Sequence, residues 1–166
     1  CPIQSYPSEA PLPSVDPLPG LRSDPAPEIT AGPSAAQVYS TPDAVWLTAE
    51  SLGDDDPALA AHPELPAMFI FDEVLLARLQ LAAKRLIFIA ECLADLADRR
   101  EVQVWRGDPT SVLASSAVAT TFAPVPGWQR RSAIIAPAAI HPWPWLVRPR
   151  GGPATSFSAW RKASGR

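Results

Sequence analysis

The stretch "PAMFIFD", residues 66 to 72, decides the fold that the sequence predicts. Its residues 68 to 71 are continuous and apolar, which is typical of a strand covered on both faces in a parallel sheet. Asp72 ends this run, and from Glu73 to Arg100 the apolar residues recur at helical spacing. The apolar side of that segment carries Leu75, Leu79, Leu86, Ile89 or Ala90, Leu93, and Leu96 or Ala97. The pattern predicts a core-facing helix that is interrupted near residues 80 to 83.

Four further apolar runs of strand length lie before and after this predicted strand and helix. They are "AVWLTA" (residues 44 to 49), "VQVW" (102 to 105), "AVATTF" (117 to 122) and "WPWLVRP" (143 to 149). The prolines of the last run assign it to an edge of the sheet. Strands that alternate with helical patterns predict an α/β fold, with a five-stranded, mostly parallel, Rossmann-like sheet flanked by helices. Ligands in such sheets bind beyond the carboxyl ends of the strands, which here lie near Thr48, Asp72 and Gly107.

The tripeptide Arg106-Gly107-Asp108 follows the third run directly. Gly107 permits a tight turn, and Asp108 before Pro109 is the pattern of a helix N-cap followed by proline at the first helical position. We therefore interpret the triplet as a strand-to-helix turn rather than as an adhesion motif.

Proline is concentrated at the amino end, where residues 1 to 40 hold nine of the 21 prolines and no apolar period. This segment is expected to be a disordered, proline-rich tail that contributes nothing to the fold. The α/β domain is expected over residues 41 to 150, and residues 151 to 166 are expected to form a linker. The sequence opens on Cys1 and its one methionine is Met68, so a fragment or a processed product is expected.

The formal net charge of −3 hides a basic end, because residues 128 to 166 carry seven bases and no acid. This end is interpreted either as a contact for phosphate or an acidic partner, or as a solvated face. No window reaches the roughly 18 apolar residues that a membrane span needs, and no signal peptide is visible. We therefore predict no membrane partner and a cytoplasmic, reducing location.

No pattern in the sequence specifies catalysis or a metal. The loop after the first strand has one glycine rather than the three spaced glycines of a dinucleotide-binding fingerprint. Cys1 and Cys92 lack metal spacing, and His62 and His141 have no cysteine or carboxylate at ligand spacing. The three aspartates at residues 54 to 56 lack the spacing of a calcium loop. Neither catalytic residues nor a metal site is predicted.

Five segments, taken together, indicate a family. They are "DDPALAA", "PAMFIFDEVLLARL", "KRLIFIAECLADL", "VQVWRGDPTSVL" and "RGGPATSFSAWRKA". Their order and approximate spacing resemble the N-terminal α/β domain of the DNA photolyase/cryptochrome family, from about residue 42 to the end. The matching features are Asp72 at the end of the second strand, the basic-then-Phe helix from Arg85 to Leu96, and the turn from Gly107 to Pro109. The basic "FRRDLR" segment of the family is replaced by "LTAESLGDD".

The resemblance implies the N-terminal part of a flavoprotein for light-driven repair of pyrimidine dimers or for blue-light signalling. It implies that FAD is bound by a C-terminal helical domain, which would be the partner of this domain, and that damaged DNA is a partner of the full-length protein. This chain would not be catalytic alone. It would be the part that carries an antenna chromophore, which in the family is a folate, a deazaflavin or a flavin. The alternative is a stand-alone, non-enzymatic binding or interaction module that retains the fold.

Five residues are candidate chromophore contacts because of their positions near the strand ends. They are Trp46, Phe71, Asp72, Lys84 and Arg85. Core packing is the alternative for Trp46 and Phe71, and surface charge is the alternative for Lys84 and Arg85.

Overall fold

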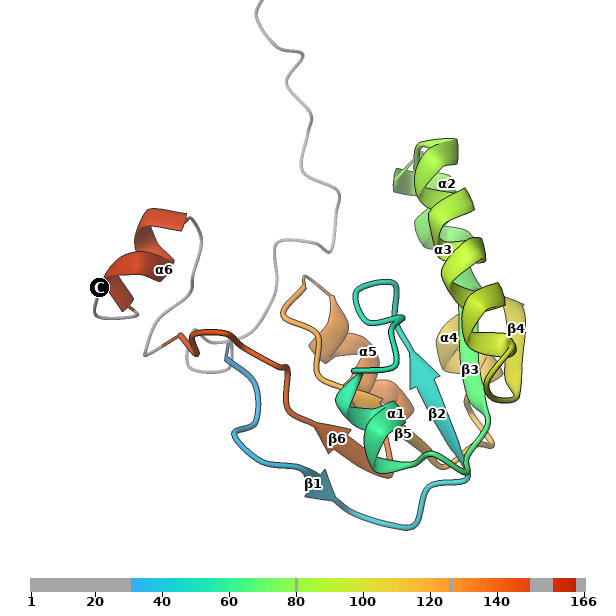
Figure 1. The fold of residues 1–166 in the computed structure, drawn as a ribbon, viewed down its shortest axis with the longest axis horizontal. Helices are drawn as coiled ribbons and strands as arrows, with labels where there is room; N and C mark the ends of the chain where they lie inside the picture. Colours follow the sequence, from blue (N-terminus) through green and yellow to red (C-terminus); the bar gives the residue numbers. More distant parts are fainter. Residues whose placement is uncertain (1–30, 80, 126, 150–156, 164–166) are drawn as a thin grey trace, which may run out of the picture.

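The structure is a computed structural model that describes residues 31–79, 81–125, 127–149 and 157–163. These residues form an α/β fold around one six-stranded sheet of order β1-β6-β5-β2-β3-β4 (Figure 1). The strands are β1 (Gln37–Val38), β2 (Ala44–Leu47), β3 (Ala67–Asp72), β4 (Val102–Gly107), β5 (Val118–Thr121) and β6 (Ala139–His141). All neighbouring strands are parallel except β1 and β6. The predicted α/β class and mostly parallel sheet are confirmed.

The sheet has six strands rather than the predicted five. The added strand, β1, pairs antiparallel with β6 and lies inside the segment that was expected to be a tail. Residues 143 to 149, the predicted fifth strand, form no strand, and the shorter β6 takes the place beside β5. The prolines of this segment explain the difference, because each removes a backbone donor that a sheet ladder needs.

Residues 31 to 40 are attached to the domain, contrary to the tail prediction. The indole of Trp145 donates a hydrogen bond to the Ala31 carbonyl at 2.9 Å, and Arg148 donates to the Pro33 carbonyl at 2.9 Å. Gly32 has a φ of +66°, and a side chain there would collide with the ring of Phe122. Residues 1 to 30 lie outside the described residues, so the tail prediction is untested for that part.

The helices include the interrupted pair that the sequence predicted. They are α1 (Pro57–Ala61), α2 (Glu73–Leu79), α3 (Ala83–Ala97), α4 (Pro109–Val112), α5 (Trp128–Ile135) and α6 (Phe157–Ala163). Two Asp-Pro pairs begin helices: the side chain of Asp56 caps α1 and that of Asp108 caps α4. The Arg-Gly-Asp triplet is thus a strand-to-helix turn, as predicted. The α6 helix lies in the predicted linker, whose remaining residues are outside the described ranges.

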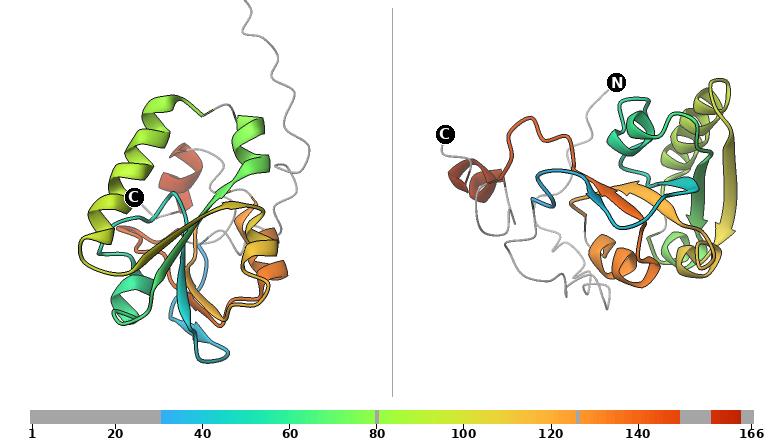
Figure 2. Two further views of the ribbon diagram at one scale, coloured as in Figure 1. Left: turned by 90° about the vertical axis from the view of Figure 1, so that its right-hand side faces the viewer. Right: turned by 90° about the horizontal axis from the view of Figure 1, so that it is seen from below.

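Helices cover both faces of the sheet (Figure 2), and buried side chains form a core layer on each face. Because side chains alternate along a strand, Val45, Leu47 and Phe69 face α1 and α3, whereas Trp46 and Met68 face the side that carries α4 and α5. The α3 helix buries Ile89, Leu93 and Leu96, three of the predicted core positions. Leu86 is only half-buried and Leu79 is exposed, so the predicted apolar side is confirmed only for the second half of the segment.

Arg100, which follows α3, connects two distant parts of the chain. Its guanidinium donates to the carbonyls of Leu59 at 3.5 Å, His62 at 3.2 Å and Pro63 at 2.8 Å. These carbonyls lie at or beyond the end of α1, where a helix leaves acceptors without intrahelical partners. The arginine therefore supplies the donors that the end of α1 lacks.

Candidate ligand-binding pocket

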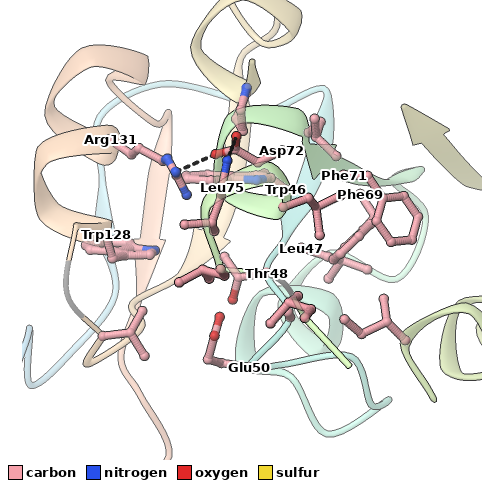
Figure 3. Close-up of a pocket in the computed structure, with 18 residues that line it drawn as sticks. Trp46, Leu47, Thr48, Glu50, Phe69, Phe71, Asp72, Leu75, Trp128 and Arg131 are labelled. Carbon is pink, nitrogen blue, oxygen red and sulfur yellow. Dashed lines mark hydrogen bonds and ion pairs between the residues drawn. The ribbon is translucent and has the colours of Figure 1, made fainter. Parts of the chain in front are cut away.

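A pocket opens where the winding of the sheet reverses. From β2 the chain moves outward to β3 and β4, then returns to the other side of β2 to form β5 and β6. The pocket lies at the carboxyl ends of β2 and β3, beside α2 and α5, and encloses about 280 Å³ (Figure 3). This is the position at which open α/β sheets bind ligands. It agrees with two of the three strand ends that the sequence singled out, Thr48 and Asp72, whereas Gly107 does not line the pocket.

The walls of the pocket are aromatic and aliphatic. Trp46 comes from β2, Phe71 from β3, and Trp128 from the start of α5. Leucines of α2, among them Leu75 and Leu76, form a further wall, and Thr48 and Glu50 add polar groups. An apolar cleft with a few convergent polar groups is the usual form of a small-molecule site.

Asp72 and Arg131 provide the charged part of the pocket. Asp72, the last residue of β3, is buried and accepts a hydrogen bond from the backbone N–H of Leu75 at 2.9 Å. Its second carboxylate oxygen forms an ion pair with the guanidinium of Arg131 on α5. The guanidinium carries five N–H donors, so it can pair with Asp72 and still donate to a ligand oxygen.

The start of α5 sets the position of both Trp128 and Arg131. Gly127 precedes the helix with a φ of +84°, a conformation that glycine adopts without strain. Trp128 then packs edge-on against Phe122, with ring centroids 4.9 Å apart. Arg131 lies three residues further along the helix and therefore on the same side.

The indole N–H of Trp128 is buried, and within the described part of the chain it has no hydrogen-bond partner. The side chain is only 6% exposed, and Figure 3 shows its nitrogen edge facing the pocket. A buried donor without an acceptor costs about 1 to 3 kcal/mol. A ligand oxygen or ring nitrogen could accept from this N–H only after a neighbouring side chain moves, because the nitrogen atom itself is buried.

Three of the five predicted site residues, Trp46, Phe71 and Asp72, line the pocket. Lys84 and Arg85 do not, because both lie exposed on the first turn of α3. Whether any of the five contacts a chromophore stays a prediction.

Sequence reasoning missed Trp128 and Arg131 as pocket residues. No pocket role was predicted for either residue, although a glycine, an aromatic residue and two arginines stand at residues 127 to 131, shortly after the fourth strand. A glycine followed by a helical pattern at a strand end was the signal that could have identified them.

The chain matches no family model, no curated protein and no solved structure. Within the described ranges, no three histidine, cysteine, aspartate or glutamate side chains are grouped as a metal site. Over the same ranges, no helix has the length and apolar character needed to cross a lipid bilayer.

Proposed function

We propose that this chain is the antenna-type α/β domain of a photolyase/cryptochrome-like flavoprotein, and that its pocket holds one planar aromatic ring system. The observation that carries the proposal is the unpaired indole N–H of Trp128, buried beside an aromatic-walled pocket at the reversal of the sheet. The sequence resemblance supports the choice of family, and the pocket is the proposed position of the chromophore.

The volume of the pocket and its N–H donors favour one class of ligand. A volume of about 280 Å³ is near the lower limit of small-molecule sites, so it accepts a single fused ring system and leaves substituents outside. Pterins, flavins and deazaflavins are flat and carry carbonyl and ring-nitrogen acceptors. One acceptor would pair with Trp128 and another with Arg131, while the ring packs between Trp46 and the leucines of α2.

The chromophore domain alone is not expected to be catalytic. In this proposal FAD belongs to a helical domain of the parent protein, which is the partner of this domain. Light-driven repair of pyrimidine dimers or blue-light signalling would be a property of the whole protein, with damaged DNA as a further partner in the repair case. The proposed location is the cytoplasm.

Direct titration tests the proposal. The purified chain is titrated with riboflavin, 8-hydroxy-5-deazaflavin and methenyltetrahydrofolate, and binding is followed by chromophore absorbance and fluorescence. Trp128→Phe keeps the aromatic wall but removes the N–H, so it should weaken binding about fivefold, since a neutral hydrogen bond contributes about 1 kcal/mol. Trp105→Phe is the matched control, because Trp105 is half-exposed on β4 and does not line the pocket. Absence of binding by all three chromophores, or equal effects of the two variants, would contradict the proposal.

A second candidate function, an interaction module, is favoured by apolar side chains outside the pocket. Ile87 and Phe88 on α3 are 55% and 61% exposed, and Val104 and Trp105 on the edge strand β4 are 52% and 49% exposed. An open groove of about 630 Å³ lies between α2, α3 and β4, and of these four residues Ile87 lines it. Exposed apolar surface of this kind marks interaction sites. Light scattering of the wild-type chain and of Phe88→Ser tests the interaction module. Self-association that the substitution abolishes, in a chain that binds no chromophore, would favour this second function.

A further inference from the structure

The two histidines of the sequence meet in the structure, although 79 residues separate them. The Nε2 atoms of His62 and His141 are 3.1 Å apart, and the ring centroids are 5.1 Å apart at an interplanar angle of 80°. His62 follows α1 as its C-cap, and His141 is the last residue of β6. The contact therefore connects the end of a five-residue helix to the end of a strand.

The surroundings of the pair disfavour positive charge. His141 is 7% exposed, and burial together with the neighbouring His62 lowers its pKa, with the carboxylate of Asp56 acting in the opposite direction. Both Asp56 oxygens are occupied: Oδ1 accepts from the backbone N–H groups of Ala58 and Leu59 and from the Thr121 hydroxyl, and Oδ2 accepts from the Ser51 hydroxyl. From the α3 side, the cationic Arg100 donates to the backbone carbonyl of His62.

We propose that His62 and His141 share a proton and act as an acid-sensitive latch between α1 and β6. In the neutral pair one Nε2 carries the hydrogen and the other accepts it. A first added proton leaves one acceptor, so the hydrogen bond is kept. A second proton makes both Nε2 atoms donors at 3.1 Å, which removes the acceptor and places two like charges in contact. The pair must then separate.

The sign of the effect follows from proton counting. In the unfolded chain each histidine takes up a proton as the pH falls below its ordinary pKa of about 6.5. The paired histidines of the folded chain take up one proton, whereas the two histidines of the unfolded chain take up two. The unfolded state therefore binds more protons, and stability falls as the pH falls. One proton of difference raises the unfolding equilibrium constant by about tenfold for each pH unit below that range.

Urea unfolding between pH 5.0 and 7.5 tests the latch, with EDTA present so that no metal ion bridges the imidazoles. The chain has no other histidine, so the double variant His62→Gln/His141→Gln removes every imidazole while the carboxylates stay the same. For each pH unit by which the pH is lowered, the unfolding equilibrium constant of the wild type should rise by a factor about ten times larger than that of the double variant. Each single variant should show the pH dependence of the double variant, because the glutamine amide can accept a hydrogen bond from the remaining imidazole when it is protonated. Equal pH dependence of wild type and double variant would overturn the proposal.

An NMR titration of the wild-type chain tests the latch without any substitution. The two imidazole Cε1–H signals should titrate in separate steps, with the second step accompanied by exchange broadening or shifts of α1 amides. Two superimposed titrations near the ordinary histidine pKa, with no response of α1, would overturn the latch even if the variants failed to fold.

Discussion

Arg131 on α5 forms an ion pair with Asp72 at the end of β3, across the pocket. Asp72 also accepts a hydrogen bond from the backbone N–H of Leu75 in the first turn of α2. One buried carboxylate therefore holds β3, α2 and α5 together at the reversal of the sheet. The pocket geometry and the stability of this corner depend on the same pair.

Replacement of Arg131 by methionine should destabilise the domain by about 1 to 3 kcal/mol, because it leaves the buried Asp72 carboxylate with one backbone donor. Arg130→Met is the control, since Arg130 lies exposed on the same helix. Urea unfolding at pH 7 measures both variants. Equal losses would show that the ion pair does not stabilise this corner.

The two Asp-Pro caps should differ in their contribution to stability. Asp56 is buried, caps α1 and also accepts from Thr121 and Ser51, so Asp56→Ala should cost about 2 to 4 kcal/mol. Asp108 is exposed and its contacts stay within α4, so Asp108→Ala should cost about 1 kcal/mol. Thermal unfolding compares them, and a reversed order would contradict the burial argument.

On α3 the buried face is assigned to Ile89, Leu93 and Leu96. Leu93→Ala should cost about 2 to 5 kcal/mol, because the residue is 4% exposed within the core. Asp95→Ala should have no measurable effect, although the Arg99 guanidinium holds the pKa of Asp95 below its usual range, because this pair is on the surface. Denaturant midpoints measure both substitutions. Similar losses of stability in the two variants would contradict the assignment of the buried face of α3.

Removal of residues 31 to 40 should destabilise the domain. A chain that begins at residue 41 loses the β1–β6 pairing and the carbonyl acceptors of Trp145 and Arg148, so a loss of about 2 to 4 kcal/mol is expected relative to a chain that begins at residue 31. Calorimetry of the two chains measures it. Indistinguishable transitions would restore the original interpretation of this segment as a tail that contributes nothing.

The central strands were predictable because each is a continuous apolar run, and the Asp-Pro caps were predictable because their chemistry is local. The two-residue strand β1 was not predictable, because its residues are exposed and carry no apolar period. Residues 143 to 149 are mostly apolar, like a strand, and their prolines were interpreted as the mark of an edge strand, whereas in the structure this segment forms no strand. The pocket position followed from strand ends. Trp128 and Arg131 reach the pocket through the path of the chain after β5, and the local sequence indicated only that a helix begins after Gly127.

The contact of Arg100 with the end of α1 has a consequence for the order in which the domain folds. A five-residue helix is too short to persist on its own, and the donor that completes its end lies 37 to 41 residues further along the chain. Such a contact forms only after the intervening loop has closed. We therefore expect this contact to stabilise α1 only after β3 and α3, which lie between Pro63 and Arg100, have brought the two ends of the loop together.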